Sequence, residues 1–525
     1  MENKQIASVF KLVGQLMELH GENKFKVRSY SNAAFQVGKY PKPIREMAVE
    51  NYESIPGIGK NLIPKLEELI QTGEMSYLNQ WLEKTPDGVI EILKIKGIGP
   101  SKVRVIWQDM GIESIGELLY ACHENRLVDY KGFGAKTQLQ VRQSIEFMME
   151  HADMFLYASV EPLIEEVKQL FLEQHPNMRI EETGAAFRKD PVLDKLEFVA
   201  EGDDGFLNDH ESRVPIIVHE AEAESFDLIQ FEESLSEEER GKISSWNGSS
   251  AEEIYAANQL PFVPGEMRNC AWGIEWASSH KEEDLVAMDR LRGCLHNHST
   301  YSDGIHSLRE MATFLKENGF EYFGISDHSK TAVYAGGLTE QEIIEQHAEI
   351  DALNKELNPF RILKGIESDI LMDGSLDYAD DVLASFDFIV ASVHSVLKMD
   401  EETATNRLIK AVENPYTSIL GHPTGRLLLS RKGYPIDHKK VIDACAANGV
   451  AVELNANPLR LDIDYTWIPY CMERDVKVSI NPDAHRVEGF DHMRYGVMAA
   501  RKGGLTTNMT LNAMSLNDLQ KELGF

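Results

Sequence analysis

The sequence predicts a multidomain chain that begins with an all-α region and ends in a distorted (β/α)7 barrel. Three observations predict this architecture. At 525 residues, the chain exceeds the length at which a single hydrophobic core stops growing. A glycine-centred turn recurs three times between helical patterns in the first 150 residues. After residue 290, short apolar runs alternate with amphipathic stretches, as they do in parallel β/α units.

The recurring turn places two glycines around one apolar residue, at residues 55–60, 95–100 and 130–135. Glycine permits a tight turn and lets backbone N–H groups at the start of the next helix approach a phosphate oxygen. One such turn is a weak signal, because a plain connection between helices looks the same. Three copies, each followed by a lysine, predict helix-hairpin-helix motifs that bind the DNA backbone without reading its sequence. The expected DNA-binding residues are Gly57, Gly59, Lys60, Gly97, Gly99, Lys102, Gly132, Gly134 and Lys136.

The net charge of −32 is distributed unevenly along the chain. Residues 1–150 contain 19 basic and 19 acidic residues, so this region is neutral and compatible with DNA binding. Residues 151–290 contain 11 basic and 32 acidic residues, and residues 291–525 contain 23 and 34. The acidic middle region would repel a DNA template unless its basic groups were gathered on one face.

The neutral first third resembles the lyase and fingers regions of family X DNA polymerases, through residues 25–34 (FKVRSYSNAA) and 55–66. The resemblance implies a lyase-like helix-hairpin-helix domain at residues 1–78 and a fingers-like one at residues 79–152. In that family, a lysine six residues after the second hairpin glycine forms a Schiff base with an abasic sugar, and that position is Lys65 here. Amine catalysis requires a lysine with a lowered pKa. The alternative is a solvated lysine without a catalytic role.

The middle of the chain resembles the palm and thumb of the same polymerases, most clearly at residues 224–226 and 252–264. The implied domains are an α/β, nucleotidyltransferase-like palm at residues 153–242 and a thumb-like segment at residues 243–289.

The catalytic carboxylates of such a palm are largely missing. Nucleotidyl transfer requires three aspartates that hold two magnesium ions, two of them spaced as DxD on one strand. Here the glycine-serine phosphate motif reads Gly184-Ala185, the DxD positions read Asp194 and Leu196, and the third aspartate falls on Ile217. We therefore predict a degenerate palm without polymerase activity. An active gap-filling polymerase is the alternative, which primer extension would reveal.

Residues 290–525 carry the pattern of a parallel barrel, with helical stretches at residues 307–318, 339–357 and 438–448 between strand-like runs. A closed barrel of this kind carries its chemistry at the carboxyl ends of the strands. The expected strands are residues 292–296, 322–326, 362–366, 386–392, 418–421, 450–455 and 477–481.

Potential metal ligands fall at or just after the ends of these runs. They are His296, His298, Asp303, His328, Glu367, His394, His422, Asp483 and His485. A lone histidine is more often a hydrogen-bonded or surface residue, but no structural need places six of the chain's 17 histidines at strand ends of one domain. Six imidazoles with three carboxylates predict a multinuclear site, and such a site implies hydrolysis of a phosphate ester.

The stretches around these ligands, among them residues 295–304 (LHNHSTYSDG) and 421–426 (GHPTGR), resemble the polymerase-and-histidinol-phosphatase (PHP) domain. The resemblance covers residues 291–525, fills every ligand position and implies three divalent ions, Zn²⁺ or Mn²⁺. The implied assignment places one ion between His296, His298, Glu367 and Asp483, a second between Glu367, His394 and His422, and a third between Asp303, His328 and His485.

Four residues are the first candidates for catalysis, and Lys330 is a fifth. Glu367 and Asp483 would act through the ions that they hold. Arg426, four residues after His422, is a candidate clamp for a phosphate oxygen. Lys330 is a second candidate clamp, and a surface role is the alternative for both cations. Lys65 is the candidate for the separate lyase reaction.

The order of these regions resembles that of bacterial family X DNA polymerases with a C-terminal PHP domain. The resemblance implies a metal-dependent DNA phosphoesterase in DNA repair, acting as a 3′–5′ exonuclease or as an end-processing or abasic-site nuclease. The alternatives are a small-molecule phosphomonoesterase of histidinol-phosphatase type, a gap-filling polymerase and a catalytically silent DNA-binding scaffold. The three hairpins count against the first, the missing aspartates against the second and the complete ligand set against the third.

The sequence also bears on where the chain acts. Its start has no basic stretch followed by an apolar one, and no apolar run approaches membrane-spanning length. We therefore expect a cytoplasmic protein whose partner is DNA and not a membrane, and no feature points to a protein partner. The five scattered cysteines argue against a disulfide framework and against a CxxC zinc module.

Overall fold

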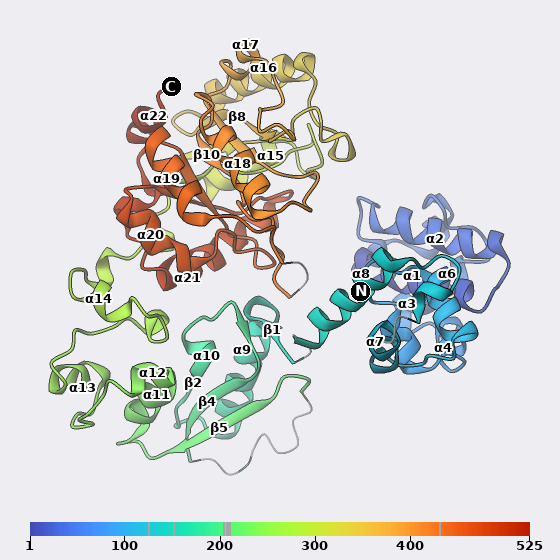
Figure 1. The fold of residues 1–525 in the computed structure, drawn as a ribbon, viewed down its shortest axis with the longest axis horizontal. Helices are drawn as coiled ribbons and strands as arrows, with labels where there is room; N and C mark the ends of the chain where they lie inside the picture. The colour runs from blue at the N-terminus through green and yellow to red at the C-terminus, as the bar shows by residue number, and fades with distance from the viewer. Residues whose placement is uncertain (124–125, 151–152, 203–204, 206–211, 430–431) are drawn as a thin grey trace. The chain divides into compact units, whose positions relative to one another are not determined.

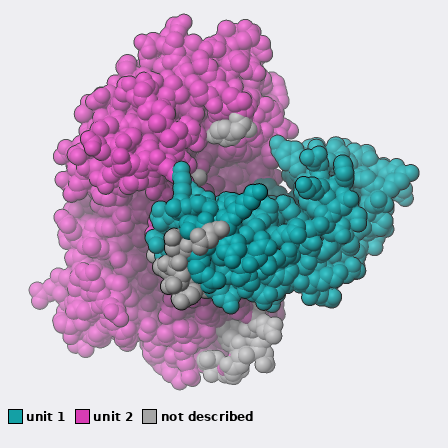
Figure 2. All heavy atoms as spheres, turned by 45° about the vertical axis from the view of Figure 1, so that its right-hand side comes forward, with its two compact units in different colours: residues 1–152 teal, residues 153–525 magenta. Residues whose placement is uncertain are grey.

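The computed structural model describes residues 1–123, 126–150, 153–202, 205, 212–429 and 432–525. The chain divides into two compact units, Met1–Ala152 and Asp153–Phe525, which Figure 2 shows in different colours. Within the described residues, no helix has the length and the apolar composition required to cross a membrane.

The first unit is helical throughout its described residues, as the sequence predicts (Figure 1). Two hydrophobic clusters hold it together, one built around the first three helices and one around the later ones. The helices are α1 (Asn3–Leu19), α2 (Lys24–Gly38), α3 (Ile63–Thr72), α4 (Ser76–Leu82), α5 (Asp87–Ile92), α6 (Pro100–Arg104), α7 (Ile115–His123) and α8 (Ala135–Glu150).

The three glycine turns share one backbone geometry. The first glycine of each turn is left-handed, with φ of 80° at Gly57, 90° at Gly97 and 95° at Gly132. Only glycine adopts this conformation without steric cost, which explains the repeat. The apolar residue between the glycines is buried in each case (Ile58, Ile98 and Phe133), and α3, α6 or α8 begins shortly after it. Burying each such side chain contributes roughly 1.5–3 kcal/mol, so the apolar residue anchors the turn to the core.

The second unit begins with a small α/β region. Its main sheet has the order β2-β4-β5, with β2 antiparallel and β5 parallel to the central strand. A separate antiparallel pair joins β1 and β3. The strands are β1 (Phe155–Leu156), β2 (Ile180–Thr183), β3 (Val192–Leu193), β4 (Leu196–Glu201) and β5 (Ile216–Ala221), with helices α9 (Tyr157–Gln174), α10 (Gly184–Phe187), α11 (Phe226–Ser234), α12 (Glu237–Arg240), α13 (Ala251–Ala257) and α14 (Gly273–Ala277).

The rest of the second unit is a nearly closed barrel of seven parallel strands, and each predicted strand is present. The strands are buried on both faces, which explains why they read as continuous apolar runs. Their order is β12-β11-β10-β9-β8-β7-β6, and a single bridge between Asn297 and Ala484 brings the two edges together. The strands are β6 (Gly293–Cys294), β7 (Tyr322–Ile325), β8 (Arg361–Asp369), β9 (Phe388–Ser392), β10 (Ile419–Leu420), β11 (Ala451–Asn455) and β12 (Val478–Asn481).

Helices connect the barrel strands and cover the barrel (Figure 1). The helices predicted at residues 307–318, 339–357 and 438–448 correspond to α15, α16 and α19. The full set is α15 (Leu308–Glu317), α16 (Glu340–Leu357), α17 (Asp380–Leu383), α18 (Glu401–Val412), α19 (His438–Asn448), α20 (Ile468–Glu473), α21 (Met493–Lys502) and α22 (Leu516–Leu523).

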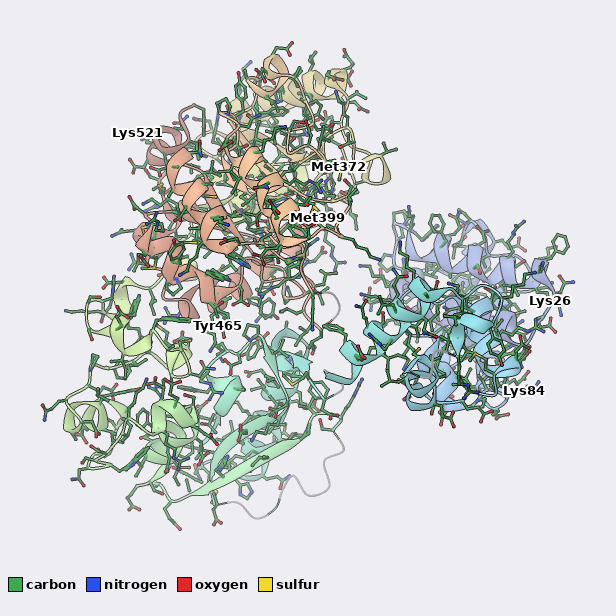
Figure 3. All side chains as sticks on the ribbon, in the orientation of Figure 1. Lys26, Lys84, Met372, Met399, Tyr465 and Lys521 are labelled. Atoms are coloured by element: carbon green, nitrogen blue, oxygen red, sulfur yellow. The ribbon has the colours of Figure 1, made fainter. Side chains whose placement is uncertain are left out.

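A buried lysine joins the α/β region to the barrel. Lys502, at the end of α21, is fully buried, and its Nζ lies 2.5 Å from Oδ1 of Asp190. The same ammonium donates to the carbonyl of Glu266 at 2.9 Å and to Oδ1 of Asn269 at 2.7 Å. Nζ of Lys502 also lies 5.4 Å from the centre of the Tyr465 ring, and Tyr465 is labelled at the lower edge of the barrel in Figure 3. One side chain from the barrel thus forms an ion pair with the α/β region and donates hydrogen bonds to the segment that follows it.

Candidate functional site

The nine predicted ligands converge at the carboxyl ends of the barrel strands. They form four overlapping groups in which one ligand atom from each residue lies within 4.8 Å of the others. The groups are His298, Asp303, His328 and His485; His296, His422 and Asp483; His296, His298 and Glu367; and His328, Glu367 and His394. Every predicted ligand belongs to at least one group.

Two of these ligands are held in an unfavourable backbone conformation. The φ angle is 23° at His422 and 51° at Asp483, a region that residues other than glycine seldom adopt. Each residue follows shortly after a strand, β10 or β12, so the turn of the backbone directs its side chain inward. Such conformations persist where the surrounding structure enforces them, and they gather at functional sites.

Glu367 is the centre of the cluster. Its Oε1 atom lies 3.2 Å from Nε2 of His296, 3.1 Å from Nε2 of His394 and 3.1 Å from Nε2 of His422. Its Oε2 atom lies 2.9 Å from Nδ1 of His328. The side chains of Glu367, His296 and His422 are buried, so the centre of the cluster is removed from solvent.

Several buried polar atoms in the cluster lack a hydrogen-bond partner among the described residues. They include Nε2 of His296, both ring nitrogens of His298 and Oε2 of Glu367. Buried polar atoms are nearly always paired, because an unpaired one costs free energy. Imidazole nitrogens and carboxylate oxygens are ligands for divalent transition metals. The donor set therefore fits metal ions held between these side chains.

The rim of the cluster is built around Asp303 and His485. Nε2 of His485 lies 3.4 Å from Oδ1 of Asp303, and Nε2 of His328 lies 3.7 Å from the same oxygen. Nε2 of His298 lies 3.1 Å from Oδ1 of Asp483, which places His298 between the rim and the interior. The loop of Asp303 is tied to this region because the Ile305 N–H donates to the His485 carbonyl at 2.7 Å.

The electrostatics of the buried groups suit metal binding. Burial and the neighbouring imidazoles of His328 and His485 lower the pKa of His298 to about 3, so its ring is neutral and offers a lone pair. Burial alone would raise the pKa of Glu367, but the adjacent imidazoles of His394 and His296 hold it well below its ordinary value. Glu367 is therefore ionised at neutral pH and can bridge cations.

Two further carboxylates contact the histidines from outside the cluster, and neither is among the predicted site residues. Glu453, in β11, lies 2.7 Å from Nδ1 of His296. Asp369, at the end of β8, lies 2.5 Å from Nδ1 of His394. A signal was present in the sequence, since Glu453 is the one charged residue in the run AVELN and Asp369 follows Glu367 at the spacing of one strand face.

The two candidate phosphate clamps have partners elsewhere. The guanidinium of Arg426 donates to the carbonyl of Arg460 at 2.9 Å, to Asp464 and to the carbonyl of Leu461. Nζ of Lys330 lies 2.7 Å from Glu340. A clamping role for Arg426 would require three interactions to break.

In the α/β region, the residues that lie beside the glycine motif differ by one position from the residues expected there by analogy with the DxD aspartates. Leu196 is fully buried, whereas the side chains of Lys195 and Glu197 share the other face of the strand. Glu197 lies against Gly184, 2.9 Å from Nζ of Lys195 and 3.6 Å from Nε2 of His219. Because strand side chains alternate, the positions beside the glycine motif are 195 and 197, and not Asp194 and Leu196. At these two positions, Glu197 is the carboxylate, and it lies between the basic side chains of Lys195 and His219.

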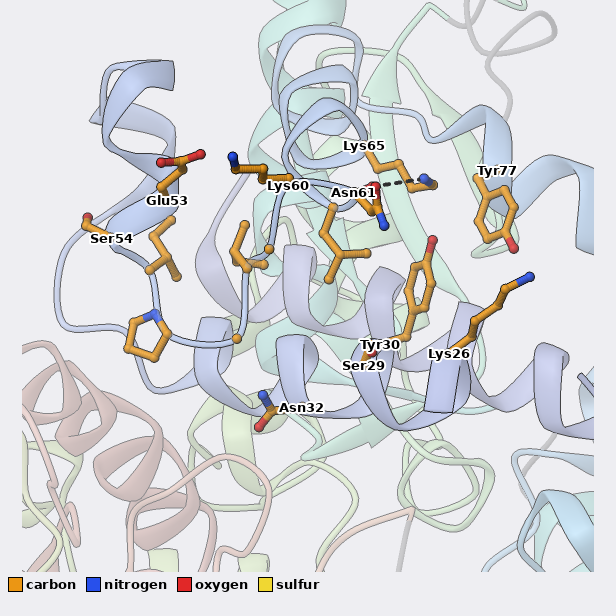
Figure 4. Close-up of a pocket in the computed structure, with 16 residues that line it drawn as sticks. Lys26, Ser29, Tyr30, Asn32, Glu53, Ser54, Lys60, Asn61, Lys65 and Tyr77 are labelled. Atoms are coloured by element: carbon orange, nitrogen blue, oxygen red, sulfur yellow. Dashed lines mark hydrogen bonds between the residues drawn. The ribbon is translucent and has the colours of Figure 1, made fainter. Parts of the chain in front are cut away.

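The first hairpin borders a hollow of about 770 Å³ (Figure 4). Its lining includes Lys26, Lys60 and Lys65 together with Tyr30 and Tyr77. Nζ of Lys65 donates to the Asn61 carbonyl at 3.1 Å and lies 4.9 Å from the centre of the Tyr77 ring. The predicted lyase lysine is thus placed inside a basic hollow next to the hairpin.

The other two hairpins lie beside each other. Nζ of Lys102, which follows the second hairpin, lies 5.7 Å from the ring centre of Phe133 in the third. The predicted DNA-binding residues of these hairpins therefore belong to one surface region.

Comparisons with known proteins match both parts of the chain. A helix-hairpin-helix domain model matches residues 1–75, a SAM-like helix-hairpin-helix tandem matches residues 89–145, and a PHP domain model matches residues 295–457. The chain is 32% identical, over 99% of its length and 99% of the relative's, to a Bacillus subtilis (strain 168) protein described as DNA polymerase/3′-5′ exonuclease PolX.

Shorter relatives match part of the chain. A probable phosphatase of Thermoanaerobacter sp. (strain X514) is 26% identical over 41% of this chain and 88% of its own length. A probable phosphatase of Acetivibrio thermocellus is 31% identical over 30% of this chain and 63% of its own length.

Proposed function

This chain belongs to the bacterial family X DNA polymerase/3′-5′ exonuclease family, with helix-hairpin-helix and PHP domains, and on that premise we propose that its barrel hydrolyses phosphodiesters in DNA. The observation that carries the proposal is the convergence of the nine predicted ligands in one cluster, with the buried carboxylate of Glu367 at its centre. The reaction would be that of a 3′–5′ exonuclease or of an end-processing or abasic-site nuclease in DNA repair.

The cofactors in this proposal are three divalent ions, Zn²⁺ or Mn²⁺, held by the nine ligands. When bound, such ions lower the pKa of a water molecule and neutralise the phosphate and the leaving oxygen. Glu367 would supply a negative charge to these ions, and Asp483 would supply a second carboxylate beside His298. The pKa of His298, about 3, leaves its ring unprotonated at neutral pH, and the inner ligands are buried while Asp303 and His485 at the rim are open to solvent.

The helix-hairpin-helix unit would hold the substrate. Its three hairpins present backbone N–H groups at the starts of helices, and its neutral net charge does not oppose a phosphate backbone. The DNA-binding surface in this proposal comprises the glycines and lysines of the three hairpins.

Template-directed synthesis is absent from this proposal. The positions beside Gly184 carry Lys195 and Glu197 where a polymerase requires two aspartates, and Glu197 is already paired with Lys195 and His219, so these positions do not supply the carboxylates that two magnesium ions need. Primer extension with Mg²⁺ or Mn²⁺ and labelled nucleotides tests this loss, because robust extension would contradict it.

A phosphomonoesterase is the second candidate, because two shorter relatives are described as probable phosphatases. The two activities separate in a competition assay. Hydrolysis of a free phosphomonoester that excess DNA inhibits supports DNA as the substrate of the cluster. Hydrolysis that DNA leaves unchanged supports a small-molecule phosphatase instead.

An abasic-site lyase is a candidate for the first unit, favoured by the position of Lys65 in the basic hollow beside the first hairpin. This activity would be independent of the metal cluster, since it requires only an amine nucleophile.

A further inference from the structure

Two histidines of the cluster, His296 and His394, each contact one carboxylate through Nε2 and another through Nδ1. Nε2 of His296 lies 3.2 Å from Oε1 of Glu367, and Nε2 of His394 lies 3.1 Å from the same oxygen. The other ring nitrogen, Nδ1, meets a carboxylate outside the cluster, Glu453 for His296 at 2.7 Å and Asp369 for His394 at 2.5 Å. Each imidazole is therefore clamped between an inner and an outer carboxylate.

The hydrogen bonds around Glu453 determine its role. Its side chain is fully buried, and among the described residues no lysine or arginine pairs with it. Oε2 accepts from the backbone N–H of His422 at 2.7 Å, and Oε1 accepts from Nδ2 of Asn481 at 3.0 Å. The Asn481 amide is oriented, because its Oδ1 accepts from the N–H of Leu295 at 3.0 Å.

These contacts assign the tautomer of His296. A carboxylate surrounded by a backbone N–H and an amide NH₂ acts as an acceptor, so Nδ1 of His296 is its third donor. The proton on Nδ1 leaves the lone pair of a neutral ring on Nε2, which faces Glu367 and Asp483. Glu453 also fixes the backbone of His422, so one side chain in β11 positions two ligands from two other strands.

Asp369 performs the same task for one ligand. Its Oδ1 meets Nδ1 of His394, and its Oδ2 accepts from Oγ1 of Thr331 at 2.8 Å. The carboxylate is thereby fixed from the side opposite the histidine. Nε2 of His394 is directed at Glu367 as a result.

We infer that Glu453 and Asp369 are positioning residues that preset His296, His422 and His394 for metal binding. Outer carboxylates of this kind fix the ring orientation and tautomer of a ligating histidine. This inference rests on the proposed metal-dependent function, but it concerns metal affinity and not the identity of the substrate. Glu453 ties together β6, β10, β11 and β12, and Asp369 acts on the neighbouring strand β9.

Metal binding to the stripped full-length protein tests the inference. Mn²⁺ is titrated into the wild type, Glu453→Gln and Asp369→Asn by calorimetry, and bound Mn²⁺ is counted after gel filtration. Glutamine keeps the shape of Glu453 but offers one acceptor oxygen to three donors. We expect each variant to bind at least one ion about 10–100-fold more weakly, while the remaining ions bind as in the wild type.

Asp387→Asn is the matched control. Asp387 is a partly buried carboxylate that accepts from the Lys364 N–H at 2.8 Å, at the amino-terminal end of β9 and away from the histidines. Its removal changes the charge of the barrel by the same amount and is expected to leave Mn²⁺ affinity unchanged. Equal affinity in Glu453→Gln, Asp369→Asn and the wild type would overturn the inference, as would equal weakening in the control.

Failure of this inference and failure of the proposed function give different results. A wild type that binds Mn²⁺ tightly but leaves DNA intact contradicts the proposed nuclease, while the affinities of the variants still decide the positioning role. A wild type that binds no Mn²⁺ or Zn²⁺ contradicts both. If Glu453→Gln does not fold, as judged by circular dichroism, the affinity of Asp369→Asn decides alone.

Discussion

Nε2 of His394, which follows β9, lies 3.1 Å from Oε1 of Glu367 in β8, and Nδ1 of the same ring lies 2.5 Å from Oδ1 of Asp369. Burial alone would lower the pKa of His394, but Glu367 and Asp369 raise it to about 10. The imidazole and the carboxylate therefore stabilise each other electrostatically in the absence of metal. A metal ion must displace the proton between them.

Glu367→Gln is expected to remove most metal binding. The substitution deletes the negative charge that faces three Nε2 atoms, and its effect on ion affinity should exceed the roughly 100-fold loss typical of outer residues. Metal content after purification without added ions measures the effect, with near three equivalents expected for the wild type and fewer than two for the variant. Glu349→Gln, which alters a carboxylate bonded to the hydroxyl of Tyr301 instead, serves as the control.

Lys502→Met is expected to destabilise the second unit by about 1–3 kcal/mol, because it leaves the Glu266 carbonyl and Oδ1 of Asn269 without their donor and leaves the half-buried carboxylate of Asp190 with Arg188 as its basic partner. Urea unfolding followed by circular dichroism measures the change. The double variant Lys502→Met, Asp190→Asn should recover part of the loss. Lys521→Met, on the exposed surface of α22 (Figure 3), should change the stability by less than about 0.5 kcal/mol. Equal effects of the two lysine substitutions would contradict the buried link.

Acid should destabilise the α/β region through Glu182. Burial alone would raise the pKa of Glu182, but Lys189 and Lys168 lower it from the ordinary 4.5 to about 2. A depressed carboxyl pKa contributes stability that is fully present above 4.5 and is lost as the pH falls towards 2. The contribution is about 3 kcal/mol at most.

Unfolding free energies measured at pH 7 and at pH 3 test this contribution. Glu182→Gln should be less stable than the wild type at pH 7 and should lose less stability on acidification. Glu173→Gln, at an exposed position of α9, should follow the wild type at both values. A Glu182→Gln protein with the same pH dependence as the wild type would show that the two lysines do not stabilise this carboxylate.

Lys65→Ala is expected to abolish borohydride trapping on abasic DNA, because the amine in the hollow beside the first hairpin would be the nucleophile. A gel shift of the covalent protein–DNA product measures the reaction. Lys84→Ala, which removes an exposed lysine of the same unit that lies over Trp81, is the control. Trapping that persists in Lys65→Ala would exclude Lys65 as the nucleophile.

The barrel and its ligands were predictable from the sequence for one physical reason. Parallel strands covered on both faces read as apolar runs, so residues such as Glu367 and His394 stand out where a run meets a polar side chain. The three hairpins were predictable because only glycine adopts the φ angle of their turns at no cost.

The outer contacts were not predictable in the same way. Glu453 and Asp369 act through residues that are distant in sequence, and no local pattern shows which ring nitrogen a carboxylate will meet. Arg426 was expected at a phosphate, but its partners lie 34 to 38 residues further along the chain. The residues of β4 beside the glycine motif, 195 and 197, differ by one position from the expected 194 and 196, because the sequence contains no DxD pair that would fix the alignment.

Degradation of a 5′-labelled oligonucleotide in Mn²⁺ tests most directly that the barrel cluster is the nuclease. The wild type is compared with the double variant His296→Ala, His298→Ala, and with His438→Ala, whose ring stacks on Trp467 at 4.4 Å outside the cluster. We predict stepwise shortening from the 3′ end by the wild type and by His438→Ala, and no shortening by the double variant while it still binds DNA. Equal degradation by the wild type and the double variant would contradict the assignment of nuclease activity to the barrel.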